Sequence, residues 1–466
     1  MRAINAATIN KAHMPETKTL KNCFFALLST IGFLLACPAE AAKPMGHTAD
    51  WTIMVFMNAK NNLEADAIAS FRDIANVGTT SRVNLVVEMG RPTQHYTSEA
   101  EGWSGVLRFL VKKGQRPVPS AAVEDLRNAT DVSDLAVALN DFVNWSVDRY
   151  PAKKYMLVIW NHGHGWRFQM AADASIRQIA TTRRLSHASI DALAAASESI
   201  PQVGGYRAVS FDEDTNSLLC MSDVQQSVEA ASQKLKRKLD VIGFDAGLTS
   251  MIETAYAFRN SSTLMVGSEE LEPAKGWDYT RPFKLLTANP TMTPLELSNQ
   301  LVAAYQNRYG DLQMTTLSVI DLSKVEAAAT ALSAFADAIS NVLTSERISI
   351  EIARSHLVPY GAGMGPLTSI DLPSFLEHYI EATSNPDTRD YAQTALDATK
   401  RMVLTNYASG FSSRNTGSKG VAIYFPASKY DLDTDFYRQG YVKRDTDVID
   451  FVAHERWADF LDSYFR

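Results

Sequence analysis

The chain has 466 residues, of which 46% are hydrophobic and 21% are charged, a composition that describes a globular protein and excludes an intrinsically disordered one. A single hydrophobic core rarely grows to this length, so we expect more than one domain. The net charge is -7 and no basic block interrupts the sequence, which argues against nucleic acid as a partner.

Residues 1–37 form a predicted signal peptide. Lys18 and Lys21 precede the apolar run CFFALLSTIGFLLAC, which is too short to be a convincing membrane-spanning helix. The run ends in LLAC, which resembles a bacterial lipobox, and Cys37 would then become the lipidated first residue of the mature chain. Ordinary cleavage near residues 39–41 is the alternative, because small residues alternate there as well. We therefore expect export to the periplasm, to the cell envelope as a lipoprotein, or into the medium. The protein would contact a membrane only through the lipid on Cys37.

Residues 38–50 are a predicted linker, and strands alternate with helices over residues 51–290. Continuous apolar runs, typical of strands covered on both faces, lie at 51–57, 83–89, 155–160, 240–244 and 263–267. Apolar residues recur at helical spacing at 63–77, 131–147, 222–235 and 250–258, and residues 103–111 suggest a hairpin arm. This alternation predicts an α/β fold with a mostly parallel sheet flanked by helices. In such sheets, functional sites lie outside the carboxyl ends of the strands.

Residues 167–215 interrupt this alternation with a polar, irregular stretch that contains Arg183 and Arg184, and we expect a long insertion loop there. Cys220 is the one cysteine that follows the signal peptide, so no disulfide framework is expected despite the predicted export.

The pattern changes over residues 291–466, where long helices dominate. Helices are expected at 294–308, 325–342, 372–381 and 391–403, with a short strand at 420–426 and a terminal helix. We expect these residues to form a second, mostly helical C-terminal domain with a small β element.

The strand at 155–160 ends in a segment, NHGHGW, that suits acid–base chemistry. His162 can take a proton from a nucleophile on a neighbouring strand end, and Gly163 lets backbone N–H groups approach a developing oxyanion. A histidine without such a partner more commonly caps a strand or bonds a loop carbonyl. A metal site is not expected, because no cysteine or carboxylate stands at ligand spacing beside His162 and His164.

The strand at 240–244 supplies the partner strand end. Its sequence DVIGFDAGLTSM places Asp245 at the end of the strand and Gly247 in the turn before the next helix. An acidic residue followed by a sharp turn at the rim of a sheet is typical of a site, although a glycine supplies no side chain to it.

Five segments, in order, resemble the motifs of the clostripain family of caspase-like cysteine peptidases. They are WTIMVFMNAKNNLE, LVIWNHGHGW, DVIGFDAGLTSMIETAYAFR, VGSEELEPAKGW and GVAIYFP with the aromatic residues after it, and together they span residues 51–466. The resemblance implies a caspase- or gingipain-like sheet followed by the helical region, and an activity that cleaves after Arg or Lys. Calcium is implied for some members, but no D-x-D-x-D-G loop places it in this sequence, and no other cofactor is evident.

The resemblance also implies roles for particular residues. His162 corresponds to the general base, Gly163 lies in the oxyanion region, and Asp245 corresponds to the acid that receives a basic P1 side chain. The nucleophilic cysteine of the family falls on Gly247, and a glycine has no heteroatom for acyl transfer.

Two further charged residues are expected near the P1 pocket. Glu269 follows the strand at 263–267 and is predicted to line the rim, with a solvated loop end as the alternative. Lys275 lies where family members often carry an acid, and a lysine facing the pocket would repel a basic substrate.

The sequence therefore predicts an exported clostripain homologue that is catalytically inactive and retains a groove for a peptide or protein ligand. The alternative is an active or residual Arg- or Lys-specific cysteine-type endopeptidase, with a nucleophile that the sequence does not reveal. A third interpretation is that Gly247 is an engineered inactivation or a sequencing error. If the protein is an inactive homologue, Gly247→Cys should restore some activity provided that the remaining geometry is intact. The loop at 167–215 should then not be cut by the protein itself.

Overall fold

The computed structural model describes residues 48–98, 102–129, 131–163, 210–212, 214–215, 217–311, 314–361, 368–434, 441 and 449–466. The predicted signal peptide with Cys37, most of the predicted insertion loop with Arg183 and Arg184, and His164 lie outside these residues. Within the described ranges, no helix has the length and apolar character needed to span a membrane.

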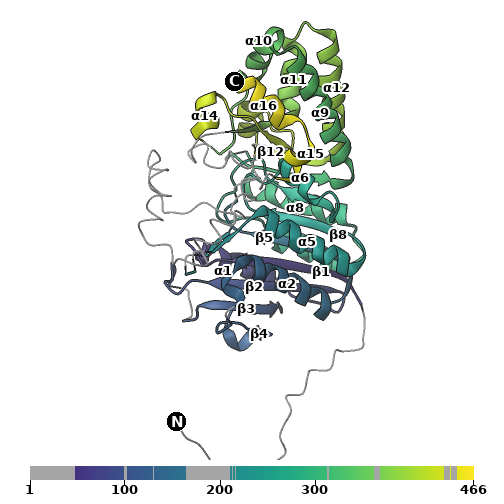
Figure 1. Ribbon diagram of the computed structural model, residues 1–466. Coiled ribbons are helices and arrows are strands. Elements are labelled where there is room, and N and C mark those ends of the chain that lie inside the picture. The colour runs from purple at the N-terminus through teal and green to yellow at the C-terminus, as the bar shows by residue number, and fades with distance from the viewer. Residues whose placement is uncertain are drawn as a thin grey trace, which may run out of the picture. The chain divides into compact units, whose positions relative to one another are not determined.

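A nine-stranded sheet forms the framework of the described residues, in the order β12-β10-β9-β8-β5-β1-β2-β3-β4 (Figure 1). Its central strands are parallel and match the predicted apolar runs: β1 (Ala49–Asn58), β2 (Val83–Arg91), β5 (Ala152–Trp160), β8 (Leu239–Asp245) and β9 (Ser262–Gly267). Antiparallel strands extend both edges, with β3 (Gly105–Leu110) and β4 (Glu124–Asp125) at one edge and β10 (Thr316–Asp321) and β12 (Val403–Ala408) at the other. The predicted α/β fold with a mostly parallel sheet is thus confirmed.

Strand β1 shows why the apolar runs are continuous. Met54 and Phe56 enter a core formed with α2 (Leu135–Arg149), α5 (Met221–Leu235) and α6 (Ile252–Phe258). Ile53 and Val55 point to the opposite core, formed with α1 (Glu64–Ala75), α7 (Thr280–Ala288) and α8 (Pro294–Tyr309). Because successive side chains of a strand point to opposite faces and both faces are covered, every position from Ile53 to Met57 is buried and apolar.

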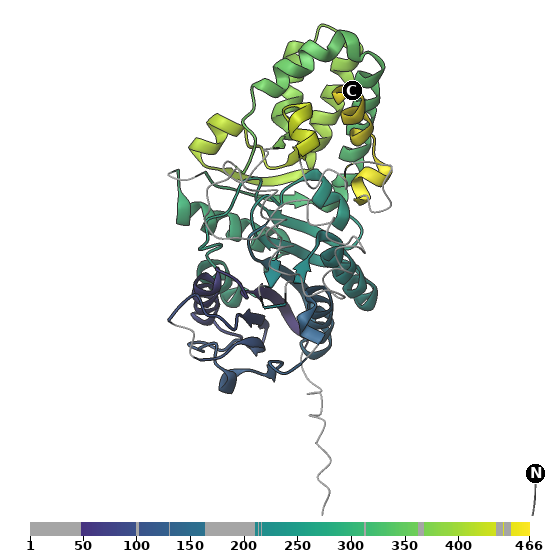
Figure 2. The ribbon, with the colours of Figure 1, turned by 60° about the vertical axis from the view of Figure 1, so that its left-hand side comes forward.

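The long C-terminal helices lie together beyond the β12 edge of the sheet (Figure 2). They are α9 (Val325–Asn341), α10 (Leu343–Ser355), α11 (Leu372–Ala382), α12 (Pro386–Met402) and α16 (Trp457–Phe465). The small β element is the antiparallel pair β11 (Ser369–Asp371) and β13 (Ala422–Tyr424). Shorter elements complete the described chain: β6 (Ser210–Asp212), β7 (Ser217–Leu219), α13 (Gly410–Thr416), α14 (Lys429–Thr434) and α15 (Asp450–His454).

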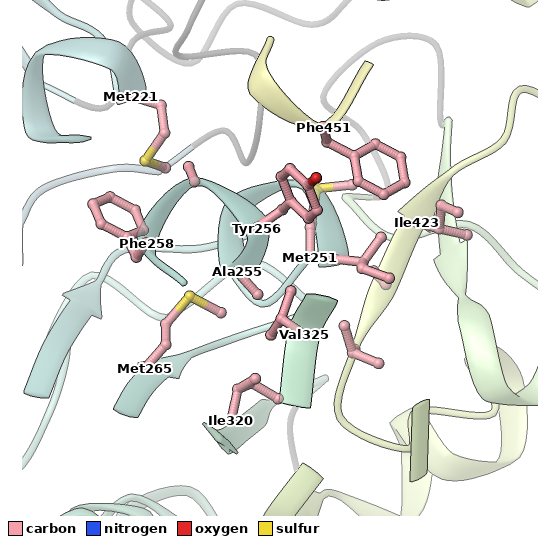
Figure 3. Packing of buried hydrophobic residues seen from close by; sticks show 14 of the residues in the cluster. Met221, Met251, Ala255, Tyr256, Phe258, Met265, Ile320, Val325, Ile423 and Phe451 are labelled. Carbon is pink, nitrogen blue, oxygen red and sulfur yellow. The ribbon is translucent and has the colours of Figure 1, made fainter. Parts of the chain in front are cut away.

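Strands β10 and β12 were not expected from the sequence, and they join the C-terminal residues to the sheet. Figure 3 shows the packing around α6, where Met265 of β9 and Ile320 of β10 lie close to Val325, and where Ile423 of β13 and Phe451 of α15 also contribute. The predicted boundary at residue 290 therefore falls between elements that build one sheet.

The register of the sheet positions the site. β5 and β8 are neighbours, and Trp160 pairs with Asp245, so both strands end at the same level. The segments that follow them, residues 161–163 and 246–247, consequently leave the sheet side by side.

Candidate functional site

The two strand ends bring the predicted base next to the predicted nucleophile position. The backbone N–H of Gly247 donates to the carbonyl of His162 at 3.1 Å. Gly163 has a φ of +87°, and a Cβ on it would lie 2.6 Å from the carbonyl carbon of Ala246. This close approach and this backbone conformation both require glycine at position 163.

His162 is oriented by two asparagines. Its Nε2 lies 2.8 Å from Oδ1 of Asn62, and its backbone N–H donates to Oδ1 of Asn161 at 2.7 Å. Since an amide oxygen accepts, Nε2 carries the proton in the neutral ring and Nδ1 is the basic nitrogen. Burial lowers the pKa of His162 to about 4, which keeps the imidazole neutral, as a general base must be. The role of Asn62 was missed by the sequence analysis, although its place just after β1, at the same sheet edge, was a usable signal.

Asp245 is buried and fully engaged by the segment that precedes α7. Its carboxylate accepts hydrogen bonds from the Tyr279 hydroxyl at 2.6 Å and from the Trp277 backbone N–H at 3.1 Å and 3.2 Å. Gly276 packs against it, so that a Cβ there would lie 2.5 Å from Oδ1 of Asp245. Burial raises the pKa of Asp245 to about 6, even though the bonds from Tyr279 and Trp277 favour the charged form.

A cavity of about 220 Å³ lies beside these residues. Its polar lining includes His162, Asn62, Asn161, Asp245 and Glu272. Glu272 was not singled out from the sequence, and both of its carboxyl oxygens are buried. Burial, and then the charge of Asp245, raise the pKa of Glu272 well above its usual range. The cavity thus holds two acidic groups and a neutral histidine, a set that can bind a cation and accept a proton.

Glu269 does not lie at this rim. Its side chain is buried, and it accepts hydrogen bonds from the Tyr360 hydroxyl at 3.1 Å and from the Gly420 backbone N–H at 2.9 Å. Burial and the neighbouring charge of Asp371 raise its pKa well above its usual range. Glu269 therefore joins β9 to the C-terminal elements rather than facing the cavity, which corrects both the predicted rim position and the solvated alternative.

Lys275 is also absent from the cavity. The N–H of Gly276 donates to the carbonyl of Pro273 at 2.8 Å, which forms a tight turn with the exposed Lys275 at its tip. The positive charge of Lys275 instead favours the ionised form of Asp66 and so acts to lower the pKa of that carboxyl. The predicted repulsion of a basic ligand by Lys275 consequently has no structural basis.

The space where a side chain of residue 247 would stand is filled by main chain. A Cβ on Gly247 would lie 2.8 Å from Cα of Leu271 and 2.9 Å from N of Glu272. This segment is held by the N–H of Leu248 donating to the carbonyl of Glu270 at 3.1 Å, and by the N–H of Thr249 donating to that of Ser268 at 2.8 Å. As it stands, the site has no room for a thiol at position 247.

No metal centre is formed by the part of the chain that the structure describes, since no three histidine, cysteine, aspartate or glutamate side chains converge there as ligands. The roles of His162, Gly163 and Asp245 stay predictions, and the geometry places the three residues together at one sheet edge.

Asp245→Asn is expected to stabilise the protein by about 2 kcal/mol at about pH 8. Because burial raises the pKa of Asp245 from 3.8 to about 6, the folded state favours the protonated carboxyl. The stability gained in this way is complete below pH 3.8 and is lost as the pH rises through 6, whereas asparagine does not ionise. Denaturant unfolding of both proteins at acidic and alkaline pH measures the difference. A difference that does not grow with pH would contradict the expectation.

Comparison with known proteins supports the same family as the sequence motifs. The sequence model of the clostripain family matches residues 55–203 and 191–464. Clostripain of Hathewaya histolytica is 21% identical over 430 residues, which cover 80% of this chain and 74% of the relative.

Two solved structures share the fold. A secreted C11 cysteine protease from Bacteroides thetaiotaomicron, in complex with an irreversible peptide inhibitor, has a TM-score of 0.53 at 16% identity and covers 89% of this chain and 99% of its own. An inactive zymogen C11 protease from Parabacteroides distasonis has a TM-score of 0.54 at 15% identity and covers 84% of this chain and 99% of its own. The sheet, the C-terminal helices and the matched sequence model agree, and the chain belongs to the clostripain family.

Proposed function

We propose that this chain is an exported, non-catalytic member of the clostripain family that binds a peptide or protein ligand. The single observation that carries the proposal is the position of Gly247. It lies against His162, where the family nucleophile is expected, and the main chain of residues 270–272 occupies the space that a side chain would need. His162 therefore has no thiol to activate, and cysteine chemistry cannot begin.

The intact cavity supports retained binding. A site that served no ligand would have no need to keep two buried carboxyl groups, which cost free energy unless they are paired. Because Lys275 lies outside the cavity, its charge does not oppose a basic side chain. The class of ligand that fits best is a peptide that inserts an arginine or lysine side chain beside Asp245 and Glu272.

Export is proposed on two grounds. The signal-peptide pattern of residues 1–37 precedes the folded part, and one of the structurally similar proteases is described as secreted. A lipid anchor on Cys37 and a free mature chain are both consistent with this pattern. Metabolic labelling with a palmitate analogue, with Cys37→Ser as the control, separates them.

The mature protein is expected to show no turnover of fluorogenic peptides that contain Arg or Lys at P1. Neither His162→Ala nor alkylation of Cys220 should change this result, because no thiol lies at position 247. The measurement is fluorescence release over hours at high enzyme concentration, with clostripain as the positive control. Turnover that disappears in His162→Ala would overturn the proposal and favour an active peptidase.

A further inference from the structure

We propose that Glu269 and Asp371 hold one proton between them, and that loss of this proton at alkaline pH opens the contact between the loop after β9 and the C-terminal elements. We call the two residues the acid joint. Neither of them lines the cavity, so a pH-sensitive joint is a feature beyond the proposed ligand binding.

The acid joint lies where three segments of the chain meet. Glu269 follows β9, Asp371 is the last residue of β11, and two consecutive backbone N–H groups bridge them. The N–H of Lys419 donates to Oδ2 of Asp371 at 2.6 Å, and the N–H of Gly420 donates to Oε2 of Glu269 at 2.9 Å. Neighbouring peptide groups thus bring the two carboxyl groups together, and the carboxyl groups are hydrogen-bonded to one another.

The remaining oxygens of the acid joint are bound by neutral donors. Oε1 of Glu269 accepts from the Tyr360 hydroxyl at 3.1 Å. Oδ1 of Asp371 accepts from the backbone N–H of Ser374 at 2.7 Å, and so caps the N-terminus of α11. Both side chains are buried, so water does not screen the two carboxyl groups from each other.

The titratable and charged groups around the acid joint add no positive charge to it. Burial and the nearby carboxyl groups raise the pKa of Tyr360 well above its usual range, which keeps this hydroxyl neutral. Glu270, the next residue of the loop, is itself an acid and accepts backbone N–H groups. The ammonium group of Lys419 bonds to Glu377 of α11 instead. Among the described residues, no lysine, arginine or histidine side chain bonds to either carboxyl of the joint.

Two buried carboxyl groups in hydrogen-bond contact require a proton, because an ionised carboxylate can only accept. Burial and then the charge of Asp371 raise the pKa of Glu269 well above its usual range, and burial raises the pKa of Asp371 as well. The hydrogen bonds from Glu269, Lys419 and Ser374 favour the ionised form of Asp371, so the proton lies on Glu269. The two groups titrate as one unit.

Alkaline pH removes the proton that makes this contact favourable. The O–H bond of Glu269 breaks, the proton passes to solvent, and two adjacent carboxylates are left in a buried site without a cation, which is strongly unfavourable. Because the pKa of Glu269 in the folded protein lies above the ordinary 4.5, the stability that the joint contributes is complete below pH 4.5. It is lost as the pH rises through the folded-state pKa.

Opening of the acid joint reaches the candidate site through the loop. Glu269 immediately precedes residues 270–272, whose main chain packs against Gly247. The carbonyl of Glu270 also accepts from the N–H of Leu248 at 3.1 Å. We therefore expect alkaline pH to loosen the main chain beside Gly247 together with β11 and the turn at 416–420, while the centre of the sheet stays closed.

Hydrogen–deuterium exchange of the mature protein, followed by mass spectrometry from about pH 6 to about pH 9, tests the joint. After correction for the intrinsic pH dependence of exchange, the rate in peptides that cover 268–276, 368–376 and 416–424 should rise about tenfold per pH unit while the proton is held, and then level off. Peptides from β1 and β2 should show no such rise.

Variants assign the proton. Glu269→Gln keeps an N–H donor for Asp371 but has no proton to lose, so the rise with pH should disappear from the three peptides. Glu377→Gln is the matched control, because Glu377 bonds to the Lys419 side chain and lies outside the joint, and it should keep the rise. The infrared spectrum of the natural chain minus that of Glu269→Gln at neutral pH should contain the band of a protonated carboxyl group. Thermal melting checks that each variant is folded.

The natural chain alone can refute the acid joint, even if a variant does not fold. Exchange in the three peptides that follows only the intrinsic pH dependence would overturn the proposal, and so would an equal rise in β1 and β2, which would mean general unfolding. A rise that persists in Glu269→Gln, or a difference spectrum with no protonated carboxyl, would show that Glu269 does not hold the proton. A local rise that Glu269→Gln abolishes and Glu377→Gln retains supports the joint.

Discussion

Gly163→Ala is expected to lower the free energy of unfolding by about 3 kcal/mol or more. The added Cβ would meet the backbone of Ala246 and Gly247 well inside van der Waals contact, and the φ of +87° adds a penalty for any residue with a side chain. The contact joins the ends of β5 and β8, so relief would require the two central strands to separate where the site is built. Denaturant unfolding of the natural and variant proteins measures the loss.

Gly114→Ala is the matched control. Gly114 has a similar φ of +73° but nothing lies within 4 Å of its Cβ position, so its substitution should cost only about 1 kcal/mol for the backbone conformation. Equal losses in the two variants would mean that the strand ends are not packed as closely as described.

Gly247→Cys is expected to destabilise the protein by about 1–3 kcal/mol and to give no measurable peptidase activity. The Cβ would stand 2.8 Å from Cα of Leu271 and 2.9 Å from N of Glu272, and backbone atoms cannot rotate aside as a side chain can. This result differs from the rescue that the sequence alone predicts, because the sequence gives no sign that the segment after β9 occupies the nucleophile space. Turnover of an arginine peptide and the unfolding midpoint are the measurements.

Gly247→Ala separates packing from chemistry. It introduces the same Cβ without a thiol, so it should lose a similar amount of stability and remain inactive. Thiol-dependent turnover in the cysteine variant that is lost on adding His162→Ala would show that residues 270–272 move aside, and would contradict the expected result.

The central sheet could be predicted from sequence because its strands are covered on both faces and leave continuous apolar runs. The outer strands β10 and β12 could not. Their sequences, TLSVID and VLTNYA, mix polar and apolar residues, and they lie among segments whose helical spacing dominates the pattern. Their assignment depends on the pairing of β10 with β9 and of β12 with β10, and local periodicity does not encode such long-range contacts.

The residues of the site also divide into those that the sequence could predict and those that it could not. His162, Gly163 and Asp245 follow strand ends, so the topology of a parallel sheet predicts that they meet. Glu269 and Glu272 belong to one loop, and nothing in SEELEP reveals that the first turns towards Tyr360 while the second lines the cavity. Which side a loop carboxylate faces is decided by tertiary packing.

The segment that closes over Gly247 is tied to distant parts of the chain. Glu269 holds the backbone N–H of Gly420, and the carbonyl of Gly420 accepts from the hydroxyls of Ser250 and Ser318 at 2.7 Å and 2.6 Å. The main chain that fills the space beside Gly247 is thus continuous with contacts that reach Ser250, Ser318 and Gly420. A side chain introduced at position 247 would press on this connected segment, so its effect on stability should extend to the junction between the sheet and the C-terminal elements.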